Sequence, residues 1–112
     1  MEVKIEKIED INIFSLAGNL DSNTSGDLEK KLIPAIDANN TKFILDFSQL
    51  HYISSAGLRV LLSAAKKLNQ FKGKLILCSV RKDIKEVFEI AGLMPIFPIY
   101  DNPEEAARKI LQ

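Results

Sequence analysis

The fold is decided by residues 43–58, FILDFSQLHYISSAGL. The first five of these residues form a nearly continuous apolar run, which is typical of a central strand buried on both faces. A helix is predicted from Ser55 to about Phe71, because leucine and alanine recur there on one stripe at helical spacing. Residues 48–52 are expected to form the loop between them. The stretch therefore predicts a buried strand that leads through a loop into a helix.

On both sides of this unit, short apolar strands continue to alternate with amphipathic helices. The predicted elements are strands at about 3–8 and 11–17 and a helix at about 24–38, then a strand at 75–78, a helix at about 81–91, a strand at 96–99 and a helix at about 103–111. Pro34 should bend the first helix or end it near residue 33, because an interior proline lacks the donor that a helix needs. The order β-β-α-β-α-β-α-β-α predicts an α/β fold with a mixed, mostly parallel sheet of about five strands and about four helices.

The composition is that of an ordinary globular protein. The 112 residues are 46% hydrophobic and 27% charged, which predicts one domain spanning residues 1–112. Fifteen Lys and Arg balance fifteen Asp and Glu, so a direct nucleic-acid partner is not expected. No apolar run approaches the roughly 20 residues of a membrane span. The single cysteine, Cys78, can form no internal disulfide, and we expect a cytoplasmic protein.

Two adjacent serines, Ser54 and Ser55, stand where the central helix is predicted to begin. A serine in this place commonly caps the helix through its hydroxyl. A hydroxyl here is also suited to accept a phosphoryl group, because a helix N-terminus favours negative charge. Residues 48–82 contain no Asp or Glu and seven Lys or Arg. This basic half is either a solvated surface or a face that binds a partner.

The run D-F-S-x-L-x-Y-I-x-S-x-G-L at residues 46–58 resembles the signature of the STAS domain. The small cytoplasmic members of this family include bacterial anti-sigma factor antagonists. Residues 16–21, LAGNLD, resemble the family's L-x-G-x-L-D segment, and residues 78–93 resemble a third family stretch that ends in Ala-Gly-Leu. The resemblance covers nearly the whole chain and implies a STAS-like fold.

The resemblance also implies a switch controlled by phosphorylation. Ser55 aligns with the phosphorylated serine of the family, and Ser54, the alternative acceptor, takes a position where many members carry Asp. The unphosphorylated form would bind an anti-sigma factor that is itself a serine kinase, and this binding would free a sigma factor. Phosphorylation by that kinase would separate the pair, and a serine phosphatase that acts on the phosphorylated form would restore the unphosphorylated one. The residues expected to contact the partner are Asp21, Ser22, Asn23, Ser54, Ser55, Ala56, Gly57 and Arg59.

Other kinds of site have little support in the sequence. His51 is the only histidine, so the sequence assigns no His–Asp pair and no histidine metal cluster around it, and we expect it in a loop. Tyr52 is expected to be a packing residue and Cys78 a small core side chain. The chain is therefore expected to be a monomer without enzymatic activity, cofactor or metal. A different role on the same fold, as a STAS scaffold or a lipid-trafficking accessory subunit without phosphorylation, stays open.

Overall fold

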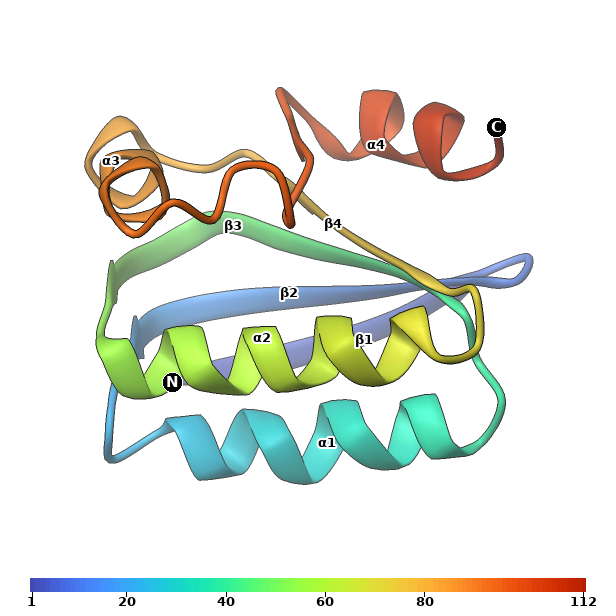
Figure 1. Cartoon of the computed structure of the whole chain (residues 1–112), viewed down its shortest axis with the longest axis horizontal. Coiled ribbons are helices and arrows are strands. Elements are labelled where there is room, and N and C mark those ends of the chain that lie inside the picture. Colours follow the sequence, from blue (N-terminus) through green and yellow to red (C-terminus); the bar gives the residue numbers. More distant parts are fainter.

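The computed structural model, which describes residues 1–112, has four helices around a five-stranded sheet of order β1-β2-β3-β4-β5 (Figure 1). The elements are β1 (Glu2–Ile8), β2 (Ile11–Leu20), α1 (Ser25–Asp37), β3 (Lys42–Ile53), α2 (Ser55–Asn69), β4 (Lys74–Cys78), α3 (Lys82–Ile90), β5 (Ile99–Tyr100) and α4 (Pro103–Ile110). β1 is antiparallel to β2, and all other neighbours are parallel. The predicted fold class and element order are confirmed.

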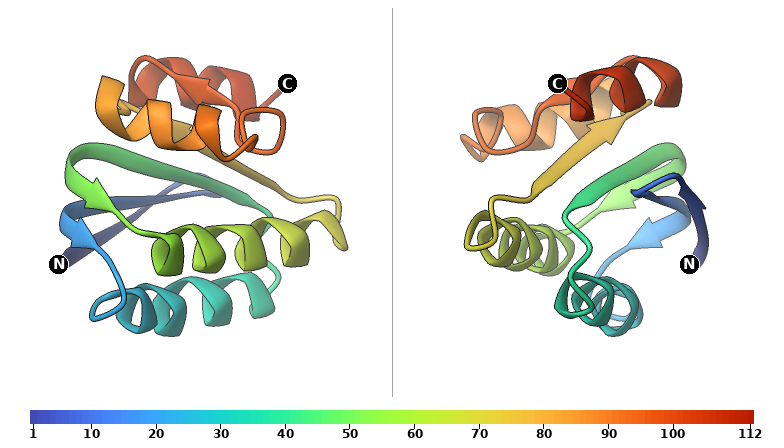
Figure 2. Two further views of the ribbon diagram at one scale, coloured as in Figure 1. Left: turned by 60° about the vertical axis from the view of Figure 1, so that its left-hand side comes forward. Right: turned by 90° about the vertical axis from the view of Figure 1, so that its right-hand side faces the viewer.

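The two faces of the sheet are covered differently (Figure 2). α1 and α2 run side by side along one face, where a core of 20 buried residues also includes Ile84 and Phe88 of α3. α4 lies on the opposite face over a smaller core of six residues, which includes Ile44, Cys78 and Ile110. β3 contributes to both cores, as its apolar run predicts. No helix combines the length and the apolar sequence that a membrane span requires.

The expectation of a loop at residues 48–52 is wrong, because β3 continues to Ile53. β2 also extends further than predicted, and the two strands stay paired up to Leu20 and Ile53 through two register shifts. These irregularities place the buried residues Phe47, Leu50 and Ile53 three apart, so the alternation of an ordinary strand is lost. His51 therefore lies in a strand, not a loop, and Tyr52 is 54% exposed, not packed.

Two other element boundaries also differ from the prediction. α1 continues through the exposed Pro34 to Asp37 without an early end, because Leu32 and Ile36 on either side of it are anchored in the core. β5 begins only at Ile99, since residues 96 and 97 turn back and donate their N–H groups to the Leu93 carbonyl oxygen. The buried ring of Phe97 accounts for the apolar pattern that suggested a longer strand.

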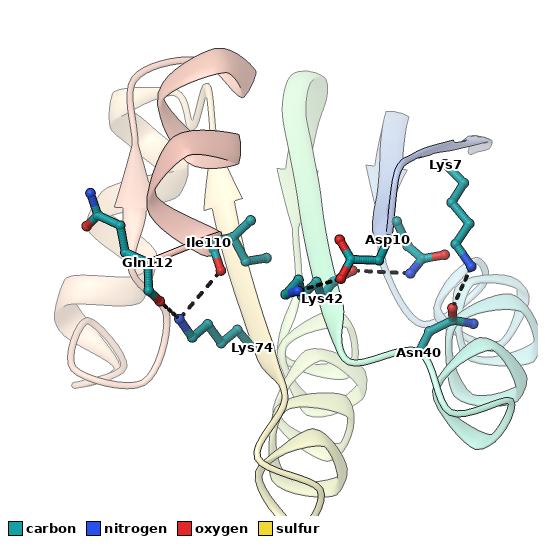
Figure 3. A network of polar contacts seen from close by, with 8 residues as sticks. Lys7, Asp10, Asn40, Lys42, Lys74, Ile110 and Gln112 are labelled. Atoms are coloured by element: carbon teal, nitrogen blue, oxygen red, sulfur yellow. Dashed lines mark hydrogen bonds and ion pairs between the residues drawn. The ribbon is translucent and has the colours of Figure 1, made fainter.

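Polar contacts hold the amino ends of the parallel strands (Figure 3). Lys42 at the start of β3 pairs with Asp10, and this hydrogen bond lowers the pKa of the Asp10 carboxyl below its ordinary value. Lys7 Nζ donates to Asn40 Oδ1 over 3.0 Å. Lys74 at the start of β4 donates to carbonyl oxygens at the end of the chain. These contacts stabilise the end of the sheet opposite to the predicted site.

Candidate functional site

The predicted site lies where β2 and β3 end side by side. Leu20 and Ile53 form the last pair of the two parallel strands. Directly beyond them, the Ser54 N–H donates to the Leu20 carbonyl oxygen over 2.9 Å. This hydrogen bond joins the β2–α1 loop to the start of α2, so the two segments predicted to bind a partner are neighbours at the carboxyl edge of the sheet.

The two adjacent serines have different environments. Ser54 is the N-cap of α2, with an extended backbone, and its carbonyl oxygen accepts from the Leu58 N–H over 3.0 Å. Its hydroxyl makes no capping hydrogen bond, however, and Ser54 Oγ is buried without any hydrogen-bond partner. The interpretation of Ser54 as a side-chain cap is therefore wrong. Ser55 is the first residue of α2 and is exposed, so the hydroxyl open to a second protein belongs to Ser55.

Gly57 sets how closely α2 approaches the end of β2. A Cβ atom at this position would lie 2.9 Å from the Leu20 carbonyl oxygen, 2.7 Å from Leu20 Cγ and 3.1 Å from Ile53 Cγ1. These separations leave no room for a methyl group without movement of the strand end. Gly57 is itself buried. It therefore supports the site by allowing close packing and offers no surface for direct contact.

Asp21 organises the β2–α1 loop. Its Oδ1 atom accepts hydrogen bonds from the Asn23 N–H at 2.9 Å and the Thr24 N–H at 3.2 Å. The Thr24 hydroxyl donates to the Asn19 carbonyl oxygen at 2.7 Å, which ties the loop to the end of β2. Ser22 and Asn23 are left exposed at its tip. The carboxylate is thus held in place within the loop that follows β2, and the end of β2 is hydrogen-bonded to the start of α2.

The exposed face of α2 is positively charged. Its first turn contains no acidic residue, and the exposed residues of its first three turns are Ser55, Arg59, Ser63 and Lys66. Arg59 takes part in none of the four ion pairs of the structure. The guanidinium group is therefore available to a partner or to a new negative charge nearby.

The contact between His51 and Arg81 was not predicted from the sequence. Arg81 Nη1 lies 2.9 Å from His51 Nδ1, and because a guanidinium can only donate, the imidazole nitrogen accepts. The contact links the extended end of β3 to the segment before α3. A strand that ends at residue 47 leaves His51 in a loop, and the sequence then does not predict that the two side chains meet. The spacing of three between Phe47, Leu50 and Ile53 was the available signal.

Cys78 and Asp46 are structural rather than reactive. Burial raises the pKa of the Cys78 thiol to about 11, and the nearby charge of Asp46 adds to this effect. The thiol is therefore protonated at neutral pH and is a poor nucleophile. Asp46 Oδ1 accepts from the Ser48 N–H over 2.9 Å, within the irregular part of β3. The prediction that Cys78 is a small core side chain is confirmed.

Comparison with known proteins identifies the family. The sequence model of the STAS domain matches residues 2–106. The chain belongs to the STAS-domain family. Its STAS domain is 41% identical to the candidate anti-sigma factor antagonist BtrV of Bordetella bronchiseptica, over 96% of this chain and 92% of that protein. It is 30% identical to the anti-sigma F factor antagonist of Paenibacillus polymyxa, over 98% of this chain and 95% of that one.

The fold of this STAS domain agrees with solved structures. The crystal structure of a candidate anti-sigma factor antagonist from Thermotoga maritima superposes with a TM-score of 0.94, covering 98% of this chain and 95% of that one. The identity between the two sequences is 21%, so the likeness concerns the fold. The overall fold of this chain has therefore been observed experimentally in a distant sequence.

Proposed function

We propose that this STAS domain is an anti-sigma factor antagonist whose binding is switched off by phosphorylation of Ser55. The observation that carries the proposal is the contrast between the two serines, since Ser55 is exposed at the start of α2 while Ser54 Oγ is buried. The names of the two relatives support the antagonist role. The ordered Asp21 loop beside Ser55 provides a second binding segment.

In the unphosphorylated state, the exposed start of α2 and the β2–α1 loop bind an anti-sigma factor that is also a serine kinase, and a sigma factor is released. The kinase transfers a phosphoryl group from ATP to Ser55 Oγ, which loses its proton, and ADP leaves. The phosphate brings a charge of about −1.5 to −2 into the interface. Its desolvation and its repulsion of carboxylates separate the complex, and a serine phosphatase reverses the change.

The free energy required is modest. A loss of about 2.7 kcal/mol weakens binding by roughly 100-fold, because each 1.4 kcal/mol corresponds to a factor of ten. The desolvation of one doubly charged group in the interface, together with its repulsion of carboxylates of the partner, is sufficient for a change of this size. In this proposal the chain acts by binding its partner in the cytoplasm and catalyses no reaction itself.

Mass spectrometry after incubation with ATP and the anti-sigma factor kinase of the same organism tests the proposal. The wild-type protein and the Ser54→Ala variant should each gain one phosphate, and the Ser55→Ala variant should gain none. A kinase that binds the wild-type protein tightly but never modifies it would refute the switch and favour a scaffold role. Phosphate retained in the Ser55→Ala variant would assign the modification to another residue.

A further inference from the structure

Arg59 lies one helical turn after Ser55 on the same exposed stripe of α2. Side chains four residues apart on a helix are neighbours, with about 5–6 Å between their Cβ atoms. The opposite side of α2 is fixed against the core by the buried residues Gly57, Val60 and Leu61. The helix therefore cannot rotate about its axis, and Ser55 and Arg59 stay on its exposed face. The long arginine side chain can therefore reach a phosphate on Ser55 within its own helix.

The charges around Ser55 favour such a pairing. Arg59 has no ion-pair partner, and the first turn of α2 contains no acidic residue to complement the positive end of the helix dipole. On the other side, the Asp21 loop is joined to the start of α2 by the hydrogen bond between the Ser54 N–H and the Leu20 carbonyl oxygen. A phosphate on Ser55 would thus meet one unpaired positive charge on its own helix, that of Arg59, and the acidic residue Asp21 lies in the adjoining loop.

We propose that Arg59 is the internal partner of phosphorylated Ser55, and that this pairing withdraws the guanidinium group from the anti-sigma factor. The inference rests on the proposed function, because it concerns the phosphorylated form of the same site. In the unphosphorylated protein, the free Arg59 binds a carboxylate of the partner. After phosphorylation it binds the phosphate instead, so one modification both introduces a negative charge and removes a positive contact.

The pairing is tested directly on the full chain with phosphoserine installed at residue 55 during translation, without any kinase. The ³¹P NMR titration of this protein measures the second pKa of the phosphate. Replacing Arg59 in the R59Q variant should raise this pKa by about 0.2 to 0.4, the size expected for one exposed pair along a helix. The difference should shrink in 1 M salt, because the charges are exposed.

The K66Q variant is the matched control. It removes one positive charge from the same face of α2, at a distance of about 16 Å along the helix from Ser55. K66Q should leave the phosphate pKa unchanged, and R59K should restore part of the shift because it keeps the charge. A phosphate pKa that is the same in R59Q and in the wild-type protein would overturn the proposal, as would equal shifts in R59Q and K66Q.

A binding measurement separates this inference from the proposed function. The ratio of the kinase affinities of the unphosphorylated and phosphorylated forms should fall about two- to fivefold in R59Q, the range of one exposed ion pair. A large ratio that R59Q leaves unchanged would overturn the role of Arg59 while the Ser55 switch stands. Equal affinities of both forms in the wild-type protein would refute the switch itself, whatever the titration shows.

Discussion

Replacement of Gly57 by alanine should loosen the junction on which the site depends. Ordinarily, alanine in place of glycine stabilises a helix interior by about 0.5–1 kcal/mol. Here the added methyl group would lie 2.9 Å from the Leu20 carbonyl oxygen and 2.7 Å from Leu20 Cγ. The carbonyl oxygen belongs to the backbone of β2 and cannot turn aside as the end of a flexible side chain could.

The size of the effect is the difference between two opposing contributions. An extra methyl group in a tightly packed contact costs about 1–3 kcal/mol. After subtraction of the gain in helix propensity, Gly57→Ala should destabilise the protein by about 0.5–2 kcal/mol, and Gly57→Val by more. At about 4 °C per kcal/mol for a chain of this length, the melting temperature should fall by about 2–8 °C.

Urea unfolding measured by circular dichroism tests this expectation, with Gly26→Ala as the matched control. A Cβ atom at Gly26, in the first turn of α1, has no other atom within 4 Å. The control variant should therefore be as stable as the wild-type protein or slightly more stable. If Gly57→Ala also unfolds at the same or a higher urea concentration than the wild-type protein, the close approach of α2 to β2 is not the reason for glycine at this position.

Four further outcomes are expected. The Ser54→Ala variant should unfold within about 0.5 kcal/mol of the wild-type protein, because the removed hydroxyl makes no hydrogen bond, whereas loss of a true N-cap costs about 1 kcal/mol. In pull-down experiments with the kinase, Ser55→Asp should bind more weakly than Ser55→Ala, and equal binding would contradict the charge mechanism. Lys42→Met should raise the pKa of Asp10 in an NMR titration, because the hydrogen bond from Lys42 lowers that pKa in the folded wild-type protein. The contribution of this pair to stability is therefore present above the ordinary Asp pKa. It is lost as the pH falls through the lower pKa of the folded state. Cys78 should react with a thiol reagent at pH 8 only on unfolding, because its pKa is about 11 and its side chain is buried, and rapid labelling of the native protein would show that this face of the sheet opens.

The parts of the fold that repeat regularly could be predicted from the sequence. The apolar run at residues 43–47 identified the central strand, and leucines at helical spacing identified α1 and α2. Prediction failed where two strands lose their regular register. Phe47, Leu50 and Ile53 are buried at intervals of three, a pattern that fits neither the period of a strand nor that of a helix. The extended end of β3, and with it the position of His51, followed only from its pairing with β2.

The candidate site was predictable in position but not in detail. Ligand and partner sites of largely parallel sheets gather at the carboxyl ends of the strands, and the structure has residues 18–24 and the start of α2 at that edge. Which serine is exposed depends on how the first turn of α2 sits against Leu20, and adjacent serines look alike in a sequence. Gly57 lets the first turn of α2 approach Leu20 closely, and the Ser54 N–H donates to the Leu20 carbonyl oxygen. In this arrangement Ser54 Oγ is buried and Ser55 is exposed.

We propose that a charge on Ser55 controls binding to the anti-sigma factor. Isothermal titration calorimetry with the kinase, comparing the unmodified protein with the protein carrying phosphoserine at residue 55, tests this claim most directly. The phosphorylated protein should bind about 100-fold more weakly or not at all, a difference of about 2.7 kcal/mol or more. Equal affinities of the two forms would contradict it.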